Sequence, residues 1–358
     1  MTKKICYFYS NYHLAEITGQ PALVEKLISK AKESSYQVSV VSNALQKKQF
    51  IKNNVNYFLV AGNDNFRSYA FNLIYILKIL IKIRPDVIHV NGLLMCLYVW
   101  IMARFLRIKL FSLISETTDK ISPLAKIFFS FISRDIKTVF TTCNYIKGQL
   151  IKFGVNENKI KVVRIGLDQK FLKSNQKDEQ LWDIFYFGDS NYARGFDIVV
   201  KLAQRLKKFK FLFSIRFQEK ECEKEINIVK NLTNAKLSFY PQGENLHSML
   251  SKSKIVVLPY RWMLIRPPIS LLEALAAGNC VITSHLPGNS EIINNKENGI
   301  LINFKQLHQV SKIIKSLVNN YEKRMKMGTE AKKTITKIYT SKEYSKIIDY
   351  YAHRENSQ

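Results

Sequence analysis

Residues 253–302 read SKIVVLPYRWMLIRPPISLLEALAAGNCVITSHLPGNSEIINNKENGILI. The apolar run 255–258 has the length of a buried strand. Pro259 and the pair Pro267–Pro268 interrupt regular structure after it, because proline lacks a backbone donor and fixes its own backbone angle. The stretch therefore opens as a buried strand followed by a proline-rich loop.

A helix is predicted from Pro268 to Ala276. Proline is tolerated at the first position of a helix, and Gly278 is well placed to end it. Residues 280–283 form a second strand-like run, which completes a βαβ unit. In parallel sheets of this kind, ligands collect beyond the carboxyl ends of the strands and at helix N-termini. Glu273 lies about one turn into the helix, so its carboxylate can reach such a ligand.

This stretch resembles the signature of the family 4 (group 1) glycosyltransferases of the GT-B fold. Their pattern is a strand, P-S or P-Y, E-x-F-G-x-x-x-x-E-A-x-A-x-G-x-P-V-I and then G-G-x-x-E. The segment EALAAGNCVI at 273–282 matches closely, and PGNSE at 287–291 resembles the final turn. Glu273 falls on the second glutamate, so the resemblance implies that it binds the ribose hydroxyls of a nucleotide-sugar.

The match also has departures. Ile265 stands at the place of the first glutamate, and Pro267–Pro268 replace Phe-Gly, which removes two backbone donors. Arg266 is a new cation beside them and can replace a lost contact to the phosphate or the donor sugar. The resemblance implies that the helix N-terminus near Ile269 and Ser270 supplies backbone N–H groups to the donor.

A second motif, GDSNYARGFD at 188–197, resembles the family pattern G-R-L-x-x-x-K-G-x-D. Arg194 takes the place of the lysine, and Asp189 replaces the arginine. A nucleoside diphosphate leaves as an anion, and Arg194 can stabilise that charge. Asp189 cannot, but it can pair with Arg194. The structural alternative is that Arg194 merely starts a helix over 195–208.

The resemblance continues in the first half of the chain. Residues 154–168 resemble the family's G-V-x-x-x-K-I-x-V-I-x-N-G-V-D, which closes the first domain. Apolar patterning predicts a helix over 66–83 and strands at 5–9, 38–41, 55–60, 86–90 and 109–114.

The family implies three candidates on the acceptor side or beside the donor. Gly19 follows the first strand and either lets the backbone approach a ligand or merely makes the turn. Asn91 ends the strand 86–90 and is preferred as a pocket residue over His89, which is interpreted as a core histidine. Glu116 follows the strand 109–114 and either binds an acceptor hydroxyl or is a helix cap or a solvated loop acid.

The chain has 358 residues, of which 47% are hydrophobic, and this is enough for two domains with separate cores. We predict two doubly wound, Rossmann-like α/β domains that face each other across a cleft, as in the GT-B fold. Residues 1–170 bind the acceptor and residues 171–338 bind the nucleotide-sugar. A final helix within 339–358 packs back on the first domain.

The formal net charge is +27. Two explanations stand side by side: an A/T-rich genome that enriches lysine, or attraction to anionic lipid and nucleotide phosphate. A basic amphipathic helix over 121–136 suits a membrane surface, or else it faces the core. No nucleic-acid recognition motif appears. The longest uncharged apolar run, 93–103, is shorter than the ~20 residues that a membrane-spanning helix needs.

Five scattered cysteines without a C-x-x-C motif indicate reduced thiols, with neither a metal site nor a disulfide framework. We therefore expect a cytoplasmic protein, peripheral on the inner face of the plasma membrane. The family implies a retaining hexosyltransferase that needs no metal or cofactor. It would move a sugar from a nucleotide-sugar to a glycan or lipid-linked glycan, in cell-surface polysaccharide or glycolipid synthesis. The departures leave open a non-catalytic partner subunit of a membrane-associated glycosyltransferase complex, and, more remotely, a sugar-nucleotide epimerase.

Overall fold

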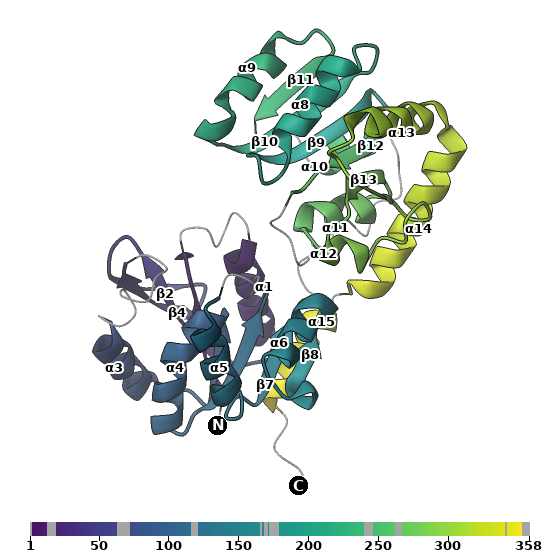
Figure 1. Ribbon diagram of the computed structural model, residues 1–358. Coiled ribbons are helices and arrows are strands. Elements are labelled where there is room, and N and C mark those ends of the chain that lie inside the picture. Colours follow the sequence, from purple (N-terminus) through teal and green to yellow (C-terminus); the bar gives the residue numbers. More distant parts are fainter. Residues whose placement is uncertain are drawn as a thin grey trace. The chain divides into compact units, whose positions relative to one another are not determined.

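The structure is a computed structural model. It describes residues 2–12, 19–62, 72–115, 121–164, 167, 171, 179–239, 246–261, 267–340 and 342–352. The chain divides into two compact units (Figure 1). Unit 1 comprises residues 1–165 together with 341–358, and unit 2 comprises residues 166–340.

Unit 1 is built on a sheet with the strand order β3-β4-β2-β1-β5-β6-β7-β8. Its neighbouring strands are parallel except for β3, which runs antiparallel to β4. The bounds are β1 Lys4–Tyr9, β2 Gln37–Ala44, β3 Lys48–Lys52, β4 Val55–Ala61, β5 Val87–Asn91, β6 Lys109–Ile114, β7 Thr138–Thr141 and β8 Ile160–Val162.

Strand β3 was not predicted from the sequence. It is joined to β4 by Asn53 and Asn54, whose φ angles of 50° and 59° lie in the left-handed region. Two-residue hairpin turns favour this conformation, and asparagine adopts it more readily than most residues. The Asn-Asn pair was thus a local signal for the hairpin.

The helices of unit 1 are α1 Gly19–Glu33, α3 Leu73–Ile83, α4 Leu93–Phe105, α5 Pro123–Ile132, α6 Asn144–Lys152, the short 3-10 helix η2 Glu157–Lys159 and the C-terminal α15 Lys342–Ala352. Helix α3 matches the C-terminal part of the helix predicted over 66–83, and residues 63–71 lie outside the described part of the chain. The yellow helix α15 lies among the elements of unit 1 in Figure 1 and contacts α1.

Helix α15 is fixed to the sheet by a buried polar contact. The Tyr351 hydroxyl lies 2.6 Å from His89 Nδ1, and the two atoms share a hydrogen bond. His89 is fully buried on β5, and its Nε2 has no hydrogen-bond partner among the described residues. Burial lowers the pKa of His89 from 6.5 to about 3, because the charged imidazolium would be desolvated there. The histidine is therefore a neutral core residue that joins the last helix to the first unit.

Unit 2 is built on an all-parallel sheet with the strand order β11-β10-β9-β12-β13-β14. The strands are β9 Trp182–Ser190, β10 Phe211–Gln218, β11 Ala235–Phe239, β12 Ser253–Leu258, β13 Cys280–Ser284 and β14 Ile300–Ile302. The helices are α8 Phe196–Arg205, η3 Lys220–Cys222, α9 Glu223–Asn231, α10 Leu246–Ser251, α11 Ile269–Ala276, α12 Pro287–Ser290, α13 Leu307–Asn319 and α14 Tyr321–Ile338. The predicted strand–loop–helix–strand unit is β12, α11 and β13, and Gly278 follows α11 with φ +74°.

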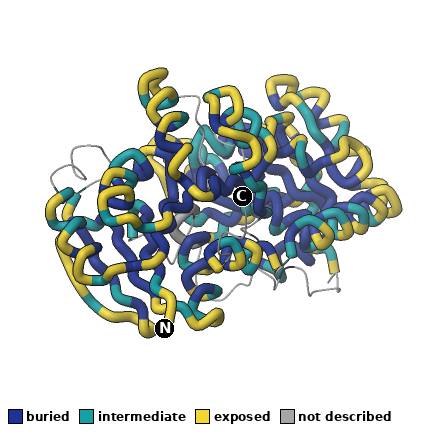
Figure 2. The backbone as a smooth tube through the Cα atoms, turned by 90° about the horizontal axis from the view of Figure 1, so that it is seen from below, coloured by how far each residue is buried: buried dark blue, intermediate teal, exposed yellow. Residues whose placement is uncertain are grey.

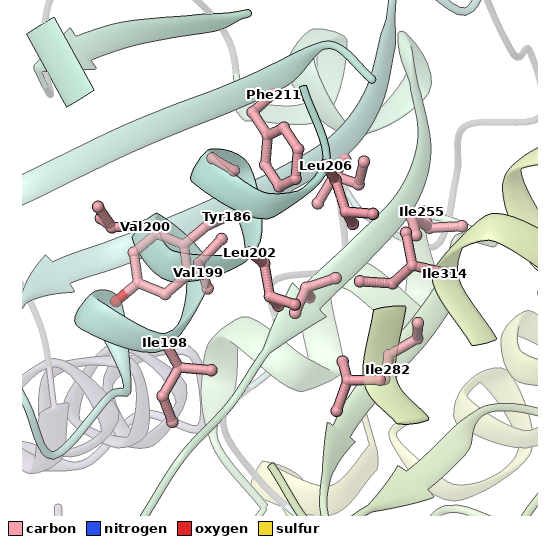
Figure 3. Packing of buried hydrophobic residues seen from close by; sticks show 14 of the residues in the cluster. Tyr186, Ile198, Val199, Val200, Leu202, Leu206, Phe211, Ile255, Ile282 and Ile314 are labelled. Atoms are coloured by element: carbon pink, nitrogen blue, oxygen red, sulfur yellow. The ribbon is translucent and has the colours of Figure 1, made fainter. Parts of the chain in front are cut away.

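Both faces of the unit 2 sheet are buried, as in parallel sheets generally. Successive residues of β9 alternate between two cores: Ile184 and Tyr186 pack with α8, α9 and α13, while Phe185 and Phe187 pack with α10, α11 and α14. Figure 3 shows the first of these cores, and Figure 2 shows the strands buried and the outer helix faces exposed.

In each sheet the chain adds strands first on one side of its first strand and then on the other, so the strand order reverses at one point. In unit 2 the chain adds β10 and β11 on one side of β9 and then β12, β13 and β14 on the other. In unit 1 the corresponding point lies between β1 and β5. Loops leave such neighbouring strands in opposite directions, which opens a crevice at the carboxyl ends where ligands bind. The fold thus marks one crevice in each unit.

Among the helices in the described ranges, none combines the length and the apolar character needed to cross a bilayer. The apolar helix α4 has 13 residues and packs against β5, β6 and α5.

We predict that His89 makes stability depend on pH. Its folded pKa lies below its unfolded value, so the stabilisation is complete above about pH 6.5 and is lost as the pH falls toward 3. The slope should approach ~1.4 kcal/mol per pH unit, the value for one proton. Denaturant unfolding of wild type and His89→Gln at several pH values from 4 to 7.5 measures this. The glutamine can still bond Tyr351 but does not titrate, so the difference between the two curves should shrink at low pH. A constant difference would contradict the prediction.

Candidate functional site

The crevice of unit 2 is closed on one side by a tight contact between two loops. Gly195, at the end of the loop after β9, has φ +71°, and a Cβ there would lie 2.0 Å from the carbonyl oxygen of Pro259. Only glycine accepts both the left-handed angle and this approach. The loop that follows β12 is also hydrogen-bonded to its neighbour, because Arg261 N donates to the carbonyl of Ala193 over 2.9 Å.

An ion pair reinforces the same contact. The guanidinium of Arg261 donates to both carboxylate oxygens of Asp197, at 2.7 Å each, and to the carbonyl of Tyr192 at 2.6 Å. Burial raises and Arg261 lowers the pKa of Asp197, and the net shift is downward. The fork-to-fork geometry of arginine and carboxylate fixes orientation as well as distance. The two loops of the crevice therefore form one connected structure.

Arg194, predicted from the second motif, lies in this structure beside Asp189. Its Nε is 2.9 Å from Asp189 Oδ2, so the expected pairing of the two residues is confirmed. Burial works to lower the pKa of Arg194, but Asp189 and two nearby tyrosines together outweigh it and the net shift is upward. Helix α8 begins two residues later, at Phe196, so Arg194 precedes the helix and belongs to the loop.

A second arginine reaches the same carboxylate from the neighbouring strand. Arg216, near the end of β10, places Nε 2.9 Å from Asp189 Oδ1 and Nη2 3.0 Å from Oδ2. The analysis of the sequence did not single out Arg216, since no motif marks it. Only the pairing of β10 with β9 brings it to Asp189.

The other wall of the crevice is the N-terminus of α11. Pro268 caps the helix with an extended backbone, and the first turn contains Ile269 and Ser270. The first N–H groups of a helix have no partner within it, and the helix dipole makes this end favourable for anions. The Ser270 hydroxyl shares a 2.5 Å hydrogen bond with that of Tyr260, which follows β12.

Tyr260 is the centre around which the candidate residues gather. Burial raises its pKa to about 12, an effect that the nearby Arg194 cation and the hydrogen bond with Ser270 oppose and that the Glu273 carboxylate increases. Ser270 bonds this hydroxyl, Arg194 precedes the glycine that contacts Pro259, and Glu273 lies three residues after Ser270 on α11. Glu273 is half-buried on α11. Four of the predicted donor-side residues, Arg194, Ile269, Ser270 and Glu273, thus belong to one region of unit 2.

The remaining candidates are placed separately. Arg266 and Glu116 lie outside the described residues. Gly19 is the first residue of α1, which follows β1, and Asn91 is the last residue of β5, where it is 4% exposed. Both therefore lie at the crevice of unit 1, because that crevice is marked by β1 and β5.

A cavity of about 690 Å³ adjoins the donor-side region at the carboxyl ends of β12, β13 and β14. Tyr260 and Arg261 are part of its lining, together with Lys201, His285 and Lys305. Within the described ranges, no group of three histidine, cysteine or acidic residues is arranged to hold a metal ion.

Comparison with known proteins agrees with this architecture. Residues 168–334 match the family model for glycosyl transferases group 1, and residues 17–171 match that for glycosyltransferase family 4. The comparison with curated protein sequences found no match.

Solved structures show the same fold at low sequence identity. Sucrose-phosphate synthase from Thermosynechococcus elongatus has a TM-score of 0.82 at 12% identity, and the match covers 98% of each chain. A glycosyltransferase from Rickettsia africae ESF-5 has a TM-score of 0.77 at 15% identity over 98% of each chain. Anabaena HepE in complex with UDP has a TM-score of 0.75 at 12% identity, over 98% of this chain and all of that one. The two family models together extend from residue 17 to residue 334, and the chain belongs to the group 1 glycosyltransferases of the GT-B fold.

Proposed function

We propose that this protein is a retaining hexosyltransferase that takes its sugar from a nucleoside-diphosphate donor. The sugar goes to a glycan or lipid-linked glycan, in the synthesis of cell-surface polysaccharide or glycolipid. The observation that carries the donor assignment is that Arg194 and the first turns of α11 meet at Tyr260 in the crevice of unit 2: Gly195, next to Arg194, contacts Pro259, and Ser270 bonds the Tyr260 hydroxyl.

Each of these groups has a role that its chemistry supports. As the bond between sugar and phosphate breaks, negative charge grows on the diphosphate, and a fixed guanidinium and a helix N-terminus stabilise it. Arg194 supplies the first, and the N–H groups of Ile269 and Ser270 supply the second. The Glu273 carboxylate accepts hydrogen bonds from the ribose hydroxyls. Two solved structures of Anabaena HepE support this class of donor, since one contains UDP and the other UDP-glucose.

We propose that unit 1 binds the acceptor. Asn91 is the last residue of β5, and in the sequence Glu116 comes two residues after the adjacent parallel strand β6. An amide can orient an acceptor hydroxyl, and a carboxylate can accept a hydrogen bond from it. We propose them as the acceptor-side residues, with Gly19 and Arg266 as further contacts to the donor.

One prediction of this proposal concerns nucleotide binding. Among UDP, GDP, dTDP, ADP and CDP, one should raise the midpoint of thermal unfolding, since a ligand at 100 times its Kd adds about 2.7 kcal/mol. Arg194→Ala should lose most of this effect by removing the phosphate contact. Glu273→Gln should weaken binding about tenfold, because a charge-assisted hydrogen bond contributes about 1.5–3 kcal/mol.

Lys254→Ala is the matched control, because Lys254 pairs with Asp183 over 2.7 Å at the opposite, amino-terminal edge of the same sheet. It should bind nucleotide as wild type does. If none of the five nucleotides shifts the midpoint, the donor assignment fails and the non-catalytic partner subunit becomes the better hypothesis. Sugar transfer by wild type, lost in Glu273→Gln, would exclude that alternative.

An exposed apolar surface of unit 1 is a candidate for contact with a membrane. Helices α4 and α5 pack together, and each carries large apolar side chains on one face at spacings of three, four or seven residues. We call this surface the α4–α5 patch; Figure 1 shows the two helices that carry it. Its members are 40–79% exposed: Leu94, Ile101, Phe105, Leu124, Ile127, Phe128 and Phe131.

The surroundings of the α4–α5 patch are basic. The segments 93–109 and 121–137 contain one acid, Asp135, which pairs with Arg104 at 2.6 Å. Arg107, Lys126 and Arg134 lie in the same segments. Apolar side chains that enter the headgroup region, flanked by cations, suit an anionic bilayer, where each cation adds about 1 kcal/mol. We propose that the protein docks on an anionic membrane through this patch, which suits a lipid-linked acceptor.

A further prediction of this proposal is tested by co-sedimentation with vesicles. Wild type should bind vesicles of phosphatidylcholine that contain ~30% phosphatidylglycerol, a fraction chosen to give a clear negative surface potential. It should bind vesicles of pure phosphatidylcholine far less. The triple variant Leu124→Ser, Phe128→Ser, Phe131→Ser should lose about tenfold or more of that affinity, because each buried apolar side chain contributes 1.5–3 kcal/mol at about full burial.

Ile51→Ser is the control for that variant. Ile51 is 70% exposed on β3, so its replacement removes an equally exposed apolar side chain outside the patch. Equal binding by the triple variant and wild type, or failure of wild type to bind anionic vesicles, would contradict the proposal.

A further inference from the structure

Asp189 poses an electrostatic problem for the proposed donor site. It stands where the resembling family has an arginine, and a carboxylate beside a diphosphate would repel it. The structure places two guanidiniums on this carboxylate, from Arg194 in the loop and from Arg216 on the adjacent strand. The cluster of these three residues therefore carries a net charge of +1. The carboxylate, which would repel a diphosphate, is paired with the two guanidiniums.

The way Arg194 binds Asp189 leaves part of its guanidinium available. Arg194 contacts the carboxylate through Nε. Its Nη1 and Nη2 have no hydrogen-bond partner among the residues that the structure describes. These two nitrogens form the terminal edge of the guanidinium, which can bind two phosphate oxygens at once. The Arg194 side chain is 19% exposed, so part of it is open to solvent.

Asp189 is itself held from several directions. Its side chain is 12% exposed, and the Arg216 fork donates two hydrogen bonds to it. Its carbonyl accepts from the Tyr186 hydroxyl at 2.8 Å and from the backbone of Asn191 at 3.0 Å. A carboxylate fixed in this way restricts Arg194 to one orientation, which reduces the entropy lost when phosphate binds.

We infer that Asp189 is a positioning residue for Arg194, and that Arg216 supplies the second cation of the diphosphate site. The cation that the family carries at the position of Asp189 comes here from the neighbouring strand β10. This inference rests on the proposed donor function and makes it more specific. The Asp189–Arg194–Arg216 cluster recognises the diphosphate, while Glu273 recognises the ribose.

Affinities for a nucleoside and for its diphosphate separate these roles. Isothermal titration calorimetry uses the nucleoside diphosphate that raises the unfolding midpoint most, and its free nucleoside. The ratio of the two Kd values gives the contribution of the two phosphates. Arg216→Gln should weaken diphosphate binding about tenfold or more and leave nucleoside binding unchanged. Arg216→Lys keeps the charge without the fork and should give an intermediate loss, which also guards against a glutamine variant that does not fold.

Asp189→Asn gives a test of sign. If Asp189 acts only through its charge, its removal relieves repulsion and the diphosphate binds more tightly. If it positions Arg194, the diphosphate binds several-fold more weakly although the site has become more positive. Asp183→Asn and Lys254→Gln are the matched controls, because this ion pair lies near the starts of β9 and β12, at the opposite, amino-terminal edge of the same sheet. Both controls should bind as wild type does.

The outcomes distinguish this inference from the proposed function. If wild type binds a nucleoside diphosphate and Arg194→Gln loses it, but Arg216→Gln binds normally, the role of Arg216 is overturned while the donor site stands. Tighter binding by Asp189→Asn overturns the positioning role in the same way. If wild type binds no nucleotide, the proposed donor function fails and this inference fails with it.

Discussion

The contact between Gly195 and Pro259 is the constraint on which the donor-side region of unit 2 depends. Two loops follow β9 and β12, the neighbouring strands at which the strand order reverses. Their backbones approach so closely that only a hydrogen atom fits between them. Any side chain at Gly195 would push the loops apart by about 1 Å or more, because its Cβ would lie 2.0 Å from the Pro259 carbonyl oxygen. Arg194 precedes this glycine and Tyr260 follows this proline, so the contact sets the distance between the cation and the N-terminus of α11.

The charged side chains in this region form two clusters, and in each cluster one carboxylate binds two cations. Asp197 holds Arg261 and accepts from Lys201 at 3.2 Å, while Asp189 holds Arg194 and Arg216. Removing one member of a buried pair usually costs more than the pair contributes, because the other charge is left without compensation. Each carboxylate here therefore fixes arginines as well as neutralising them, and a fixed arginine is the form in which a guanidinium binds phosphate most effectively.

The carboxyl edges of the two sheets carry different side chains. The edge in unit 2 has cations and a helix N-terminus, which suit a diphosphate. The edge in unit 1 has Asn91, and the helices α4 and α5 of the same unit carry the apolar and basic α4–α5 patch. The core of unit 1 also includes α15, bonded to His89, so residues from the end of the chain complete the unit formed by its beginning. The first and last parts of the sequence should therefore unfold together.

The sequence by itself determined the local elements and the family. Apolar runs, prolines and glycines located β12, α11 and β13, because these features depend on residues near each other in the chain. The motif spacing, which is also local, selected Arg194, Ser270 and Glu273 as candidate donor-side residues. The hairpin strand β3 was missed, since its short polar sequence has no apolar periodicity. Only the tertiary structure decided that Arg216 reaches Asp189, that Tyr260 lies among the donor-side residues and that Tyr351 meets His89. The physical reason is that such contacts depend on the order of strands and the packing of distant helices, which no local pattern of residues records.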